Sequence, residues 1–252
     1  MYMRMVQVRI KRGALPKLQA FYKDRVITAL QEVQGCRYAG FMLNIHNPEE
    51  CISLTLWDSP ADSLAYEKSG TFSELLDEMR PYLMESSEPR IQLSRDLRLE
   101  YVDVPEEPVV STYDVAAAGS LERHGPESTE NIWVRIVSLK LRPGRVEEFK
   151  RAYSDQVIPT LQKVKGCRYA YLTERNGKPN EVFSVTSWDS RQDAEAYEKG
   201  GLFGKLLESQ QHLLSELYEW KKLRERTNKA EIATSEDVAV EHYDVLVGRS
   251  FK

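Results

Sequence analysis

The sequence lacks two features that would quickly assign it to a class, a long apolar run and an excess of basic residues. No apolar stretch approaches the roughly 20 residues that a membrane-spanning helix needs, and the chain does not open on a basic segment followed by an apolar core. The 35 basic and 39 acidic residues give a net charge of −4, which does not favour nucleic-acid binding. With 41% hydrophobic and 29% charged residues, the composition is that of a globular protein. We therefore expect a cytoplasmic globular protein that binds neither membrane nor nucleic acid.

Cysteine and histidine are also scarce. The cysteines are Cys36, Cys51 and Cys167. They are odd in number and form no CxxC pair, so we expect small buried residues rather than disulfides or reactive thiols. The histidines are His46, His124, His212 and His242. They are scattered along the chain without the spacing of metal ligands, and none has a histidine 131 residues before or after it, so we expect no metal site.

What the sequence does contain is a long internal repeat. GlyCysArgTyrAla stands at 35–39 and again at 166–170, an offset of 131 residues (166 minus 35). TrpAspSer and AlaTyrGluLys recur at the same offset, the first at 57–59 and 188–190, the second at 65–68 and 196–199. Because the offset is constant and only two copies are present, a whole domain has been duplicated. The predicted parts are a first domain at 1–117, a linker at 118–130 and a second domain at 131–252.

Both copies predict the same order of elements. In the first copy an alternating strand at 3–10 precedes a helical pattern of period 3.6 at 15–33, and a hairpin then leads to a third strand at 51–57. Two short helices and a strand at 91–102 follow, while the last helix of the second copy is expected to continue through 218–220. Strand, helix, two strands, helices and strand form the split βαβ order of a ferredoxin-like α+β domain.

Glycine, serine and proline mark the expected ends and bends of helices. Gly35 and Gly166 are expected to be left-handed residues that end the long helix of each copy. Ser59 and Ser190 are expected to cap the short helix that follows the third strand. Pro159 falls inside the long helix of the second copy, where it predicts a kink.

The third strand has two dissimilar faces. One face is aliphatic and consists of Ile52, Leu54 and Leu56, and the other consists of Ser53, Thr55 and Trp57. We expect the aliphatic face to meet the helices and the other face to lie on the open side of the sheet. An open, partly apolar face usually marks an interface. We therefore predict two ferredoxin-like domains packed sheet to sheet as an intramolecular α+β barrel, a pseudo-dimer within one chain that is open to further homo-oligomer formation.

These motifs resemble a known family. A third strand that ends in TrpAspSer and is followed by AlaTyrGluLys, with GlyCys opening the second strand, is similar to the antibiotic-biosynthesis monooxygenase (ABM) domain of the dimeric α+β barrel superfamily. The resemblance covers nearly all of both copies except the linker. It implies two domains that pack sheet against sheet, with a cavity in each half. It implies less about the reaction, because the superfamily also contains proteins that are not monooxygenases.

The haem-degrading branch of that family is not favoured. A resemblance to this branch would imply an asparagine on the first strand, a tryptophan on the short helix and a histidine on the next helix as iron ligand. The matching positions hold Val6 and Val137, Tyr66 and Tyr197, and Leu76 and Leu207. Haem iron would then have no evident axial ligand, with His212 and His46 as the remaining candidates.

The second branch oxidises quinols or anthrones with O₂ and without a cofactor. It implies a largely apolar pocket, a few polar groups that hold a phenol, and a cation that favours the phenolate. The candidate pocket residues are Trp57, Trp188, Tyr66, Tyr197, Tyr38, Tyr169, Arg37, Arg168, Arg4, Arg135, Asn44 and His46. No carboxylate and histidine pair stands out as a general base, and no catalytic residue is assigned.

Each candidate also has a structural explanation. The tryptophans would equally serve as packing anchors, the tyrosines as core residues with a wet hydroxyl, and the arginines as surface charges. Strand alternation also prevents Arg37 and Tyr38 from facing the same pocket. Two hypotheses therefore stand, a cofactor-independent monooxygenase of a small aromatic compound and a non-catalytic barrel that binds a small molecule or serves a structural role.

The two copies differ most around the end of the second strand and its loop. Met42, Leu43, Asn44 and His46 of the first copy correspond to Thr173, Glu174, Arg175 and Gly177 of the second. We therefore expect two unequal ligand sites, with the difference located at this hairpin.

Overall fold

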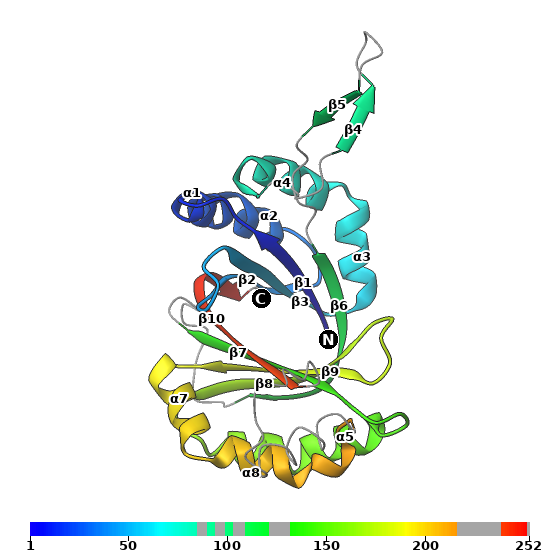
Figure 1. Cartoon of the computed structure of the whole chain (residues 1–252), viewed down its shortest axis with the longest axis vertical. Helices are drawn as coiled ribbons and strands as arrows, with labels where there is room; N and C mark the ends of the chain where they lie inside the picture. Colours follow the sequence, from blue (N-terminus) through cyan, green and yellow to red (C-terminus); the bar gives the residue numbers. More distant parts are fainter. Residues whose placement is uncertain (85–89, 94–98, 103–108, 121–131, 216–237, 251–252) are drawn as a thin grey trace. The chain divides into compact units, whose positions relative to one another are not determined.

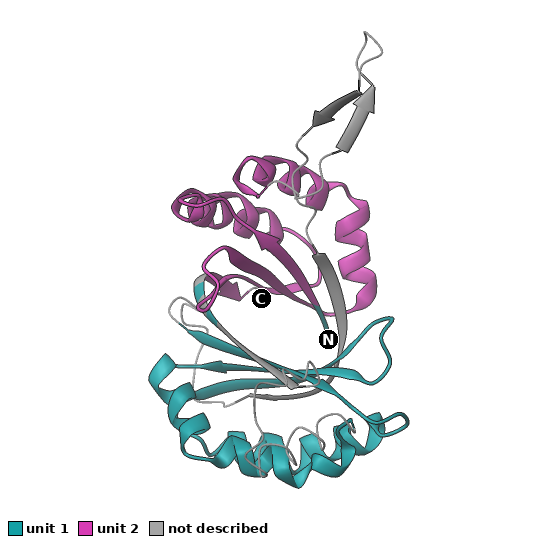
Figure 2. Cartoon of the chain, in the orientation of Figure 1, with its two compact units in different colours: residues 1–3, 112–245 teal, residues 4–111, 246–252 magenta. Residues whose placement is uncertain are grey.

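The computed structural model describes residues 1–84, 90–93, 99–102, 109–120, 132–215 and 238–250. They divide into two compact units, coloured separately in Figure 2. Unit 1 comprises Met1–Met3 and Thr112–Val245, and unit 2 comprises Arg4–Ser111 and Leu246–Lys252. The packing of one sheet against the other stays a prediction.

Unit 2 holds most of the first copy. Its strands are β1 (Tyr2–Arg9), β2 (Cys36–Asn44) and β3 (Glu50–Trp57), in the sheet order β1-β3-β2. Its helices are α1 (Leu15–Phe21), η1 (Tyr22–Val26), α2 (Ile27–Gln31), α3 (Pro60–Lys68), α4 (Thr71–Met79) and η2 (Arg80–Tyr82). Buried aliphatic side chains of the first helical segment, Leu18 and Leu30 among them, form the core between helices and sheet.

Unit 1 repeats this plan. Its strands are β7 (Trp133–Lys140), β8 (Cys167–Arg175) and β9 (Glu181–Trp188), with most of β6 (Val109–Ser120) and the first part of β10 (Val238–Ser250). Its helices are α5 (Val146–Ala152), η3 (Tyr153–Val157), α6 (Ile158–Leu161), α7 (Arg191–Lys199), α8 (Leu202–Ser209) and η4 (Gln211–Leu213). Within the unit, the antiparallel order is β10-β7-β9-β8-β6, and Figure 1 shows α5, α7 and α8 on one face of this sheet. The ferredoxin-like α+β fold in two copies is confirmed.

The unit boundaries differ from the repeat boundaries because of β6. Residues Tyr113–Ser120 of this strand pair antiparallel with β8, so the end of the predicted first domain lies in the sheet of the second copy. The first three residues of the predicted linker, 118–120, are part of the same strand. The rest of that linker, residues 121–130, lies outside the part of the chain that the structure describes.

Each long helix contains a π-helical turn, η1 in unit 2 and η3 in unit 1. Pro159 follows η3 within two residues, yet the first copy has the same turn with Thr28 at the matching position. The proline is therefore not the cause of the turn. Single π turns often occur at functional sites, and these two turns hold Tyr22 and Tyr153 in place.

The serine caps and the positive φ of the two glycines are confirmed, but the glycines do not cap the long helices. α2 ends with Glu32 as its C-cap and α6 with Gln162, so Gly35 and Gly166 lie in the turn that leads to the next strand, beside the serine cap. Gly35 and Gly166 both have φ of +80°, and Ser59 and Ser190 accept hydrogen bonds from the backbone N–H three residues on. A Cβ added at Gly35 would stand 2.5 Å from Cγ of Asp62, the third residue of the α3 cap. Only glycine lets the chain reverse so close to that cap.

The predicted orientation of the third strand is wrong. Ser53 and Thr55 line a cavity together with residues of the helices of unit 2, and Trp57 stacks on Tyr66 of α3. The polar face of β3 therefore meets the helices. The aliphatic side chains did not show which face of the strand meets the helices, because the hydroxyl groups of the other face form hydrogen bonds on the side that the helices cover. One such partner is the Tyr22 hydroxyl, 2.8 Å from Ser53 Oγ.

The predicted strand at 91–102 is also wrong. β4 (Arg90–Leu93) and β5 (Leu99–Val102) pair antiparallel as a separate two-stranded sheet, so the segment reverses direction. The predicted helix through 218–220 lies outside the described residues. In the part that is described, no helix is both long and apolar enough to cross a membrane.

Candidate active site

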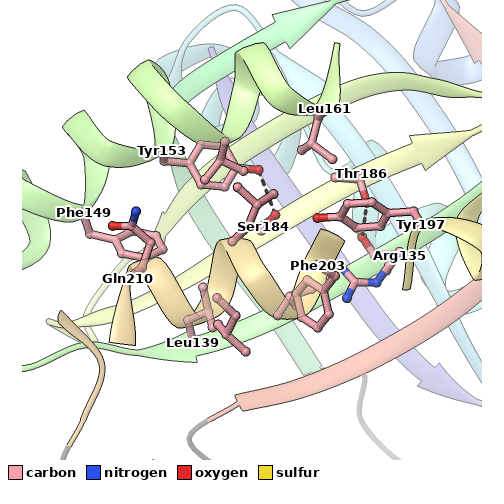
Figure 3. A pocket seen from close by; sticks show the side chains of 14 residues that line it. Arg135, Leu139, Phe149, Tyr153, Leu161, Ser184, Thr186, Tyr197, Phe203 and Gln210 are labelled. Carbon is pink, nitrogen blue, oxygen red and sulfur yellow. Dashed lines mark hydrogen bonds between the residues drawn. The ribbon is translucent and has the colours of Figure 1, made fainter. Parts of the chain in front are cut away.

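Each unit contains one cavity between its sheet and its own helices. The unit 1 cavity has a volume of about 40 Å³ and the unit 2 cavity about 50 Å³, and both are partly open to solvent. Figure 3 shows the unit 1 cavity from close by. Volumes of this size are well below those of small-molecule sites, so a ligand the size of an aromatic ring system needs the lining side chains to move apart.

Most lining positions are the same in the two cavities. The shared pairs are Arg4 and Arg135, Val6 and Val137, Tyr22 and Tyr153, Val26 and Val157, Leu30 and Leu161, Ser53 and Ser184, Thr55 and Thr186, Tyr66 and Tyr197, Phe72 and Phe203, Leu75 and Leu206, and Leu76 and Leu207. Each pair has the offset of the repeat. The cavity is therefore a feature of the duplicated domain and not an accident of one copy.

A buried arginine forms one end of each cavity. The Arg135 side chain is 2% exposed, and its Cζ lies 4.0 Å from the centre of the Phe203 ring and 5.8 Å from that of Tyr197. Its Nε donates to the Glu198 carboxylate, but Nη2 has no hydrogen-bond partner among the described residues. A buried guanidinium N–H without a partner costs free energy, which an anionic or carbonyl oxygen of a ligand would recover.

Arg4 has the matching position in unit 2. Arg4 is 2% exposed, and its Cζ lies 4.0 Å from the centre of the Phe72 ring and 6.0 Å from that of Tyr66. The two arginines thus share one environment, a cation held against two aromatic rings at the wall of an apolar cavity.

A tyrosine and serine pair lies in the middle of each cavity. The hydroxyl groups of Tyr22 and Ser53 are 2.8 Å apart, and so are those of Tyr153 and Ser184. Burial raises the pKa of Tyr22 and of Tyr153 far above the ordinary value, so both phenols stay neutral. Such a pair offers a hydrogen bond to a ligand but not a base.

The second tyrosine of each cavity connects the arginine to the tryptophan. Burial raises the pKa of Tyr66 and of Tyr197 to about 12, although the nearby arginine opposes that rise. Trp188 stacks behind Tyr197 at 5.1 Å between ring centres, and its Nε1 donates to Thr186 Oγ1 at 2.9 Å. Thr186 in turn donates to the backbone oxygen of Arg135 at 3.4 Å. This chain of contacts fixes the arginine, and its counterpart in unit 2 runs from Trp57 through Thr55 to Arg4.

The sequence candidates thus fall into two groups. Arg4, Tyr66, Arg135 and Tyr197 line the cavities, whereas Trp57 and Trp188 are fully buried behind the tyrosines and do not line them. The remaining candidates do not line either cavity.

Those remaining candidates take part in local structure. Arg37 is paired with Asp58 through two hydrogen bonds of 2.7 Å, and Arg168 is paired with Asp189. Tyr169 stacks on Tyr171 at 6.2 Å, and the matching Tyr38 is half-buried on β2.

The two candidates of the first hairpin also lie outside the cavity lining. Asn44 accepts hydrogen bonds from the backbone N–H groups of His46 and Asn47, which shapes the turn. His46 itself is exposed.

Sequence reasoning missed the pairs Tyr22 and Tyr153, Ser53 and Ser184, Thr55 and Thr186, and Phe72 and Phe203. The tyrosines stand in an apolar helical stripe and the hydroxyl residues on a strand face that was assigned to the wrong side. The available signal was a polar residue type that recurs at the repeat offset inside core elements. Gln210 was missed for another reason, because it has no such counterpart in the first copy.

The residues present do not fit haem. Val6 and Val137 line the cavities, and so do Leu76 and Leu207 at the place of the iron ligand. Aliphatic side chains cannot coordinate iron. Neither cavity lining includes His46 or His212, and the described residues contain no group of three or more histidine, cysteine, aspartate or glutamate side chains that would hold a metal ion.

Comparison with known proteins finds one family in both copies. Residues 1–78 and 133–209 match the family model described as antibiotic biosynthesis monooxygenase. No curated protein matches the sequence.

Solved structures extend this likeness to the whole chain. A protein from Fusobacterium nucleatum described as a candidate monooxygenase superposes with a TM-score of 0.69 at 9% identity, over 99% of this chain and 94% of that chain. A candidate monooxygenase from Lactobacillus acidophilus gives 0.63 at 7% identity, over 100% and 99%. An anthrone oxidase-like protein gives 0.53 at 14% identity, over 99% and 93%. At these identities the likeness shows the fold, which here includes both copies.

Proposed function

The chain belongs to the antibiotic biosynthesis monooxygenase family, and from the chemistry of its two cavities we propose that it oxidises a small hydroxylated aromatic compound, such as a quinol or an anthrone, with O₂ and without a cofactor. The observation that supports this proposal most is the Arg135 guanidinium, which is buried at the wall of an apolar cavity with Nη2 lacking a partner among the described residues.

The arginine suits the charge that such a reaction develops. Loss of a phenolic proton places negative charge on one oxygen, and a fixed cation in a site of low dielectric stabilises that charge more than water would. The resulting phenolate is electron-rich and reduces O₂ more readily than the neutral phenol. Arg135 would thereby favour the reactive form of the substrate.

The neutral tyrosines would position the ring. Since burial keeps the Tyr197 phenol protonated, with its pKa at about 12, this residue would donate to or accept from a substrate oxygen beside the arginine. Tyr153 and Ser184 would contact the middle of the ring system. The aliphatic walls, which include Val137 and Leu161, would exclude water from the reacting carbon.

The overall reaction balances without a cofactor. For an anthrone, the methylene carbon loses two hydrogen atoms and gains one oxygen atom as a carbonyl, and the second atom of O₂ leaves with those hydrogens as water. No carboxylate or imidazole lines the described part of either cavity, so the first proton would leave to solvent.

Oxygen uptake with a panel of quinols and anthrones tests the proposal. We expect uptake with at least one compound, one atom of isotopically labelled O₂ in the product, and a large loss in a double variant with Arg4→Met and Arg135→Met. Each single variant, checked for folding by its melting temperature, controls for the contribution of the other cavity.

The second candidate function is a non-catalytic protein that binds a small molecule. The lack of a carboxylate or imidazole in the described lining favours it, because most proton-transfer catalysts use one of these groups. No oxygen uptake with any member of the panel, together with a compound that raises the melting temperature, would decide for binding alone.

A further inference from the structure

The two cavities differ at the end away from the arginine. In unit 1 this end is lined by Gln210 and Phe149, and in unit 2 the position of Gln210 is taken by Met79. Phe21 lines the unit 2 cavity, while its counterpart Ala152 does not line the other. The far end is thus polar in unit 1 and apolar in unit 2.

Gln210 is held in one orientation. The residue is 4% exposed, and its Nε2 donates to Oε1 of Gln156 at 3.1 Å and to Oγ of Ser209 at 3.2 Å. Both amide hydrogens are thereby used. The hydrogen bonds of the side chain to described residues are made by Nε2, and the carbonyl Oε1 is not among the fully buried atoms without a partner. This acceptor is therefore open to a ligand that donates to it.

The cavity of unit 1 therefore has complementary polar groups at its two ends. Figure 3 shows Gln210 beside Phe149 at one end and Arg135 beside Tyr197 and Phe203 at the other, with the Tyr153 and Ser184 pair between them. The arginine end offers a donor and a positive charge, and the glutamine end offers an acceptor. Unit 2 keeps the first end and replaces the second by a thioether side chain, which packs against apolar groups.

We propose that Gln210 sets the ligand preference of unit 1: this cavity binds aromatic compounds that carry a hydroxyl group at the end opposite the oxygen bound by Arg135, whereas the unit 2 cavity binds those with an alkyl group there. The proposal rests on the proposed function only in taking the ligand to be a small hydroxylated aromatic compound. Two different substrates, or one substrate in two states of hydroxylation, would then be bound by the same chain.

A matched pair of ligands tests this assignment. The first is a naphthalenediol with hydroxyl groups at the two ends of its long axis, and the second is the methylnaphthol in which one of these hydroxyls is a methyl group. For the parent protein we expect calorimetry to resolve two sites, a diol-preferring site and a methylnaphthol-preferring site. Each preference should be about tenfold, which corresponds to about 1.4 kcal/mol.

Gln210→Met gives unit 1 the residue of unit 2, and Met79→Gln makes the reverse exchange. The first variant should lose the diol-preferring site and show two sites that prefer the methylnaphthol. The second should weaken methylnaphthol binding at unit 2 about tenfold and strengthen diol binding less than that, because Arg25 stands where unit 1 has Gln156 and is paired with Glu78. Melting temperatures show whether either variant has failed to fold.

Arg135→Met separates failure of this proposal from failure of the proposed function. If it weakens both ligands at one site while Gln210→Met leaves the preference unchanged, the cavity binds aromatics but Gln210 does not select among them. If the parent protein binds neither ligand, or if Arg135→Met changes nothing, the cavity is not the site and both proposals are wrong.

Discussion

In unit 1 the cavity wall runs from Arg135 to Gln210, and in unit 2 the matching wall runs from Arg4 to Met79. The arginine ends agree in residue type and in geometry, since each guanidinium lies 4.0 Å from the centre of a phenylalanine ring. The opposite ends agree in neither polarity nor hydrogen bonding. The comparison separates an end that the two cavities share from an end at which they differ.

The arginine end also serves the fold. In each unit a threonine, Thr55 or Thr186, accepts a hydrogen bond from the tryptophan indole and donates one to the backbone oxygen of the arginine. Replacing the threonine would therefore leave the buried indole N–H without its partner. Gln210 has no such role in the sheet, because it contacts Gln156 and Ser209 near the ends of helices. A substitution at this position therefore leaves the hydrogen bonds of the sheet intact.

The largest effect should come from Arg135→Met. Loss of the guanidinium removes a charge-assisted hydrogen bond, and we expect ligand affinity at unit 1 to fall about 100-fold, or about 2.7 kcal/mol. Calorimetry should then report one remaining site, and Arg4→Met should remove the other instead. Loss of both sites in either single variant would contradict the independence of the two cavities.

The next largest effect should be the loss of folding stability at alkaline pH. The folded protein raises the pKa of Tyr66 and Tyr197 from 10.0 to about 12, so it favours the neutral phenols. The stability they contribute is fully present below pH 10 and is lost as the pH rises to about 12, because the unfolded chain ionises first. We expect about 2 kcal/mol to be lost for each tyrosine, measured by urea unfolding across this range.

The two units again provide the control for this pH effect. Tyr66→Phe and Tyr197→Phe should each remove a similar share of the alkaline loss, because burial is the main cause of both shifts. If a phenylalanine in one unit alone abolished the whole loss of stability at alkaline pH, the environments of the two tyrosines would not be equivalent.

The sequence predicted the fold well because the repeat marks the corners of each domain. Gly35, Asp58 and Ser59 belong to the repeated motifs, and the structure joins them: the Asp58 N–H donates to the Gly35 carbonyl oxygen at 2.8 Å. Such local geometry requires particular residue types, so duplication preserves it visibly. The motifs that identified the family are thus largely those that close a corner, not those that line the cavity.

The cavity itself could be predicted only in part. Arg4 and Arg135 were candidates because a cation would stabilise an oxyanion, but the two faces of the third strand of each copy were assigned to the wrong sides, which hid Ser53 and Ser184. The expected difference between ligand sites at the hairpin stays a prediction, and its residues do not line the cavity of unit 1. Glu174 is paired with Lys150 and Arg175 with Glu181, and neither lines the cavity. Side-chain pairing across elements is what the linear pattern does not contain.

A smaller effect should follow from Gly35→Ala. A positive φ alone makes alanine unfavourable by about 1 kcal/mol, and Gly13→Ala should show that cost, since a Cβ there meets no atom within 4 Å. At Gly35 the Cβ would also displace Asp62 from the helix cap, which adds about 1 kcal/mol. In urea unfolding, Gly35→Ala and Gly166→Ala should therefore have similar free energies of unfolding, and both should be lower than that of Gly13→Ala. Equal costs at positions 13 and 35 would contradict the role of the corner.

The smallest effect should come from the arginines of the repeated motif. Arg37 and its partner Asp58 have side chains that are 48% and 46% exposed, whereas those of Arg168 and Asp189 are 21% and 35% exposed. Water and salt screen the first pair more, so Arg168→Met should lower the free energy of unfolding more than Arg37→Met. Because neither side chain lines a cavity, ligand affinity should stay at the parent value in both variants. Raising the salt concentration should reduce the stability difference of each variant from the parent. A loss of ligand binding in Arg37→Met or Arg168→Met would instead return these residues to the site and contradict its placement between sheet and helices.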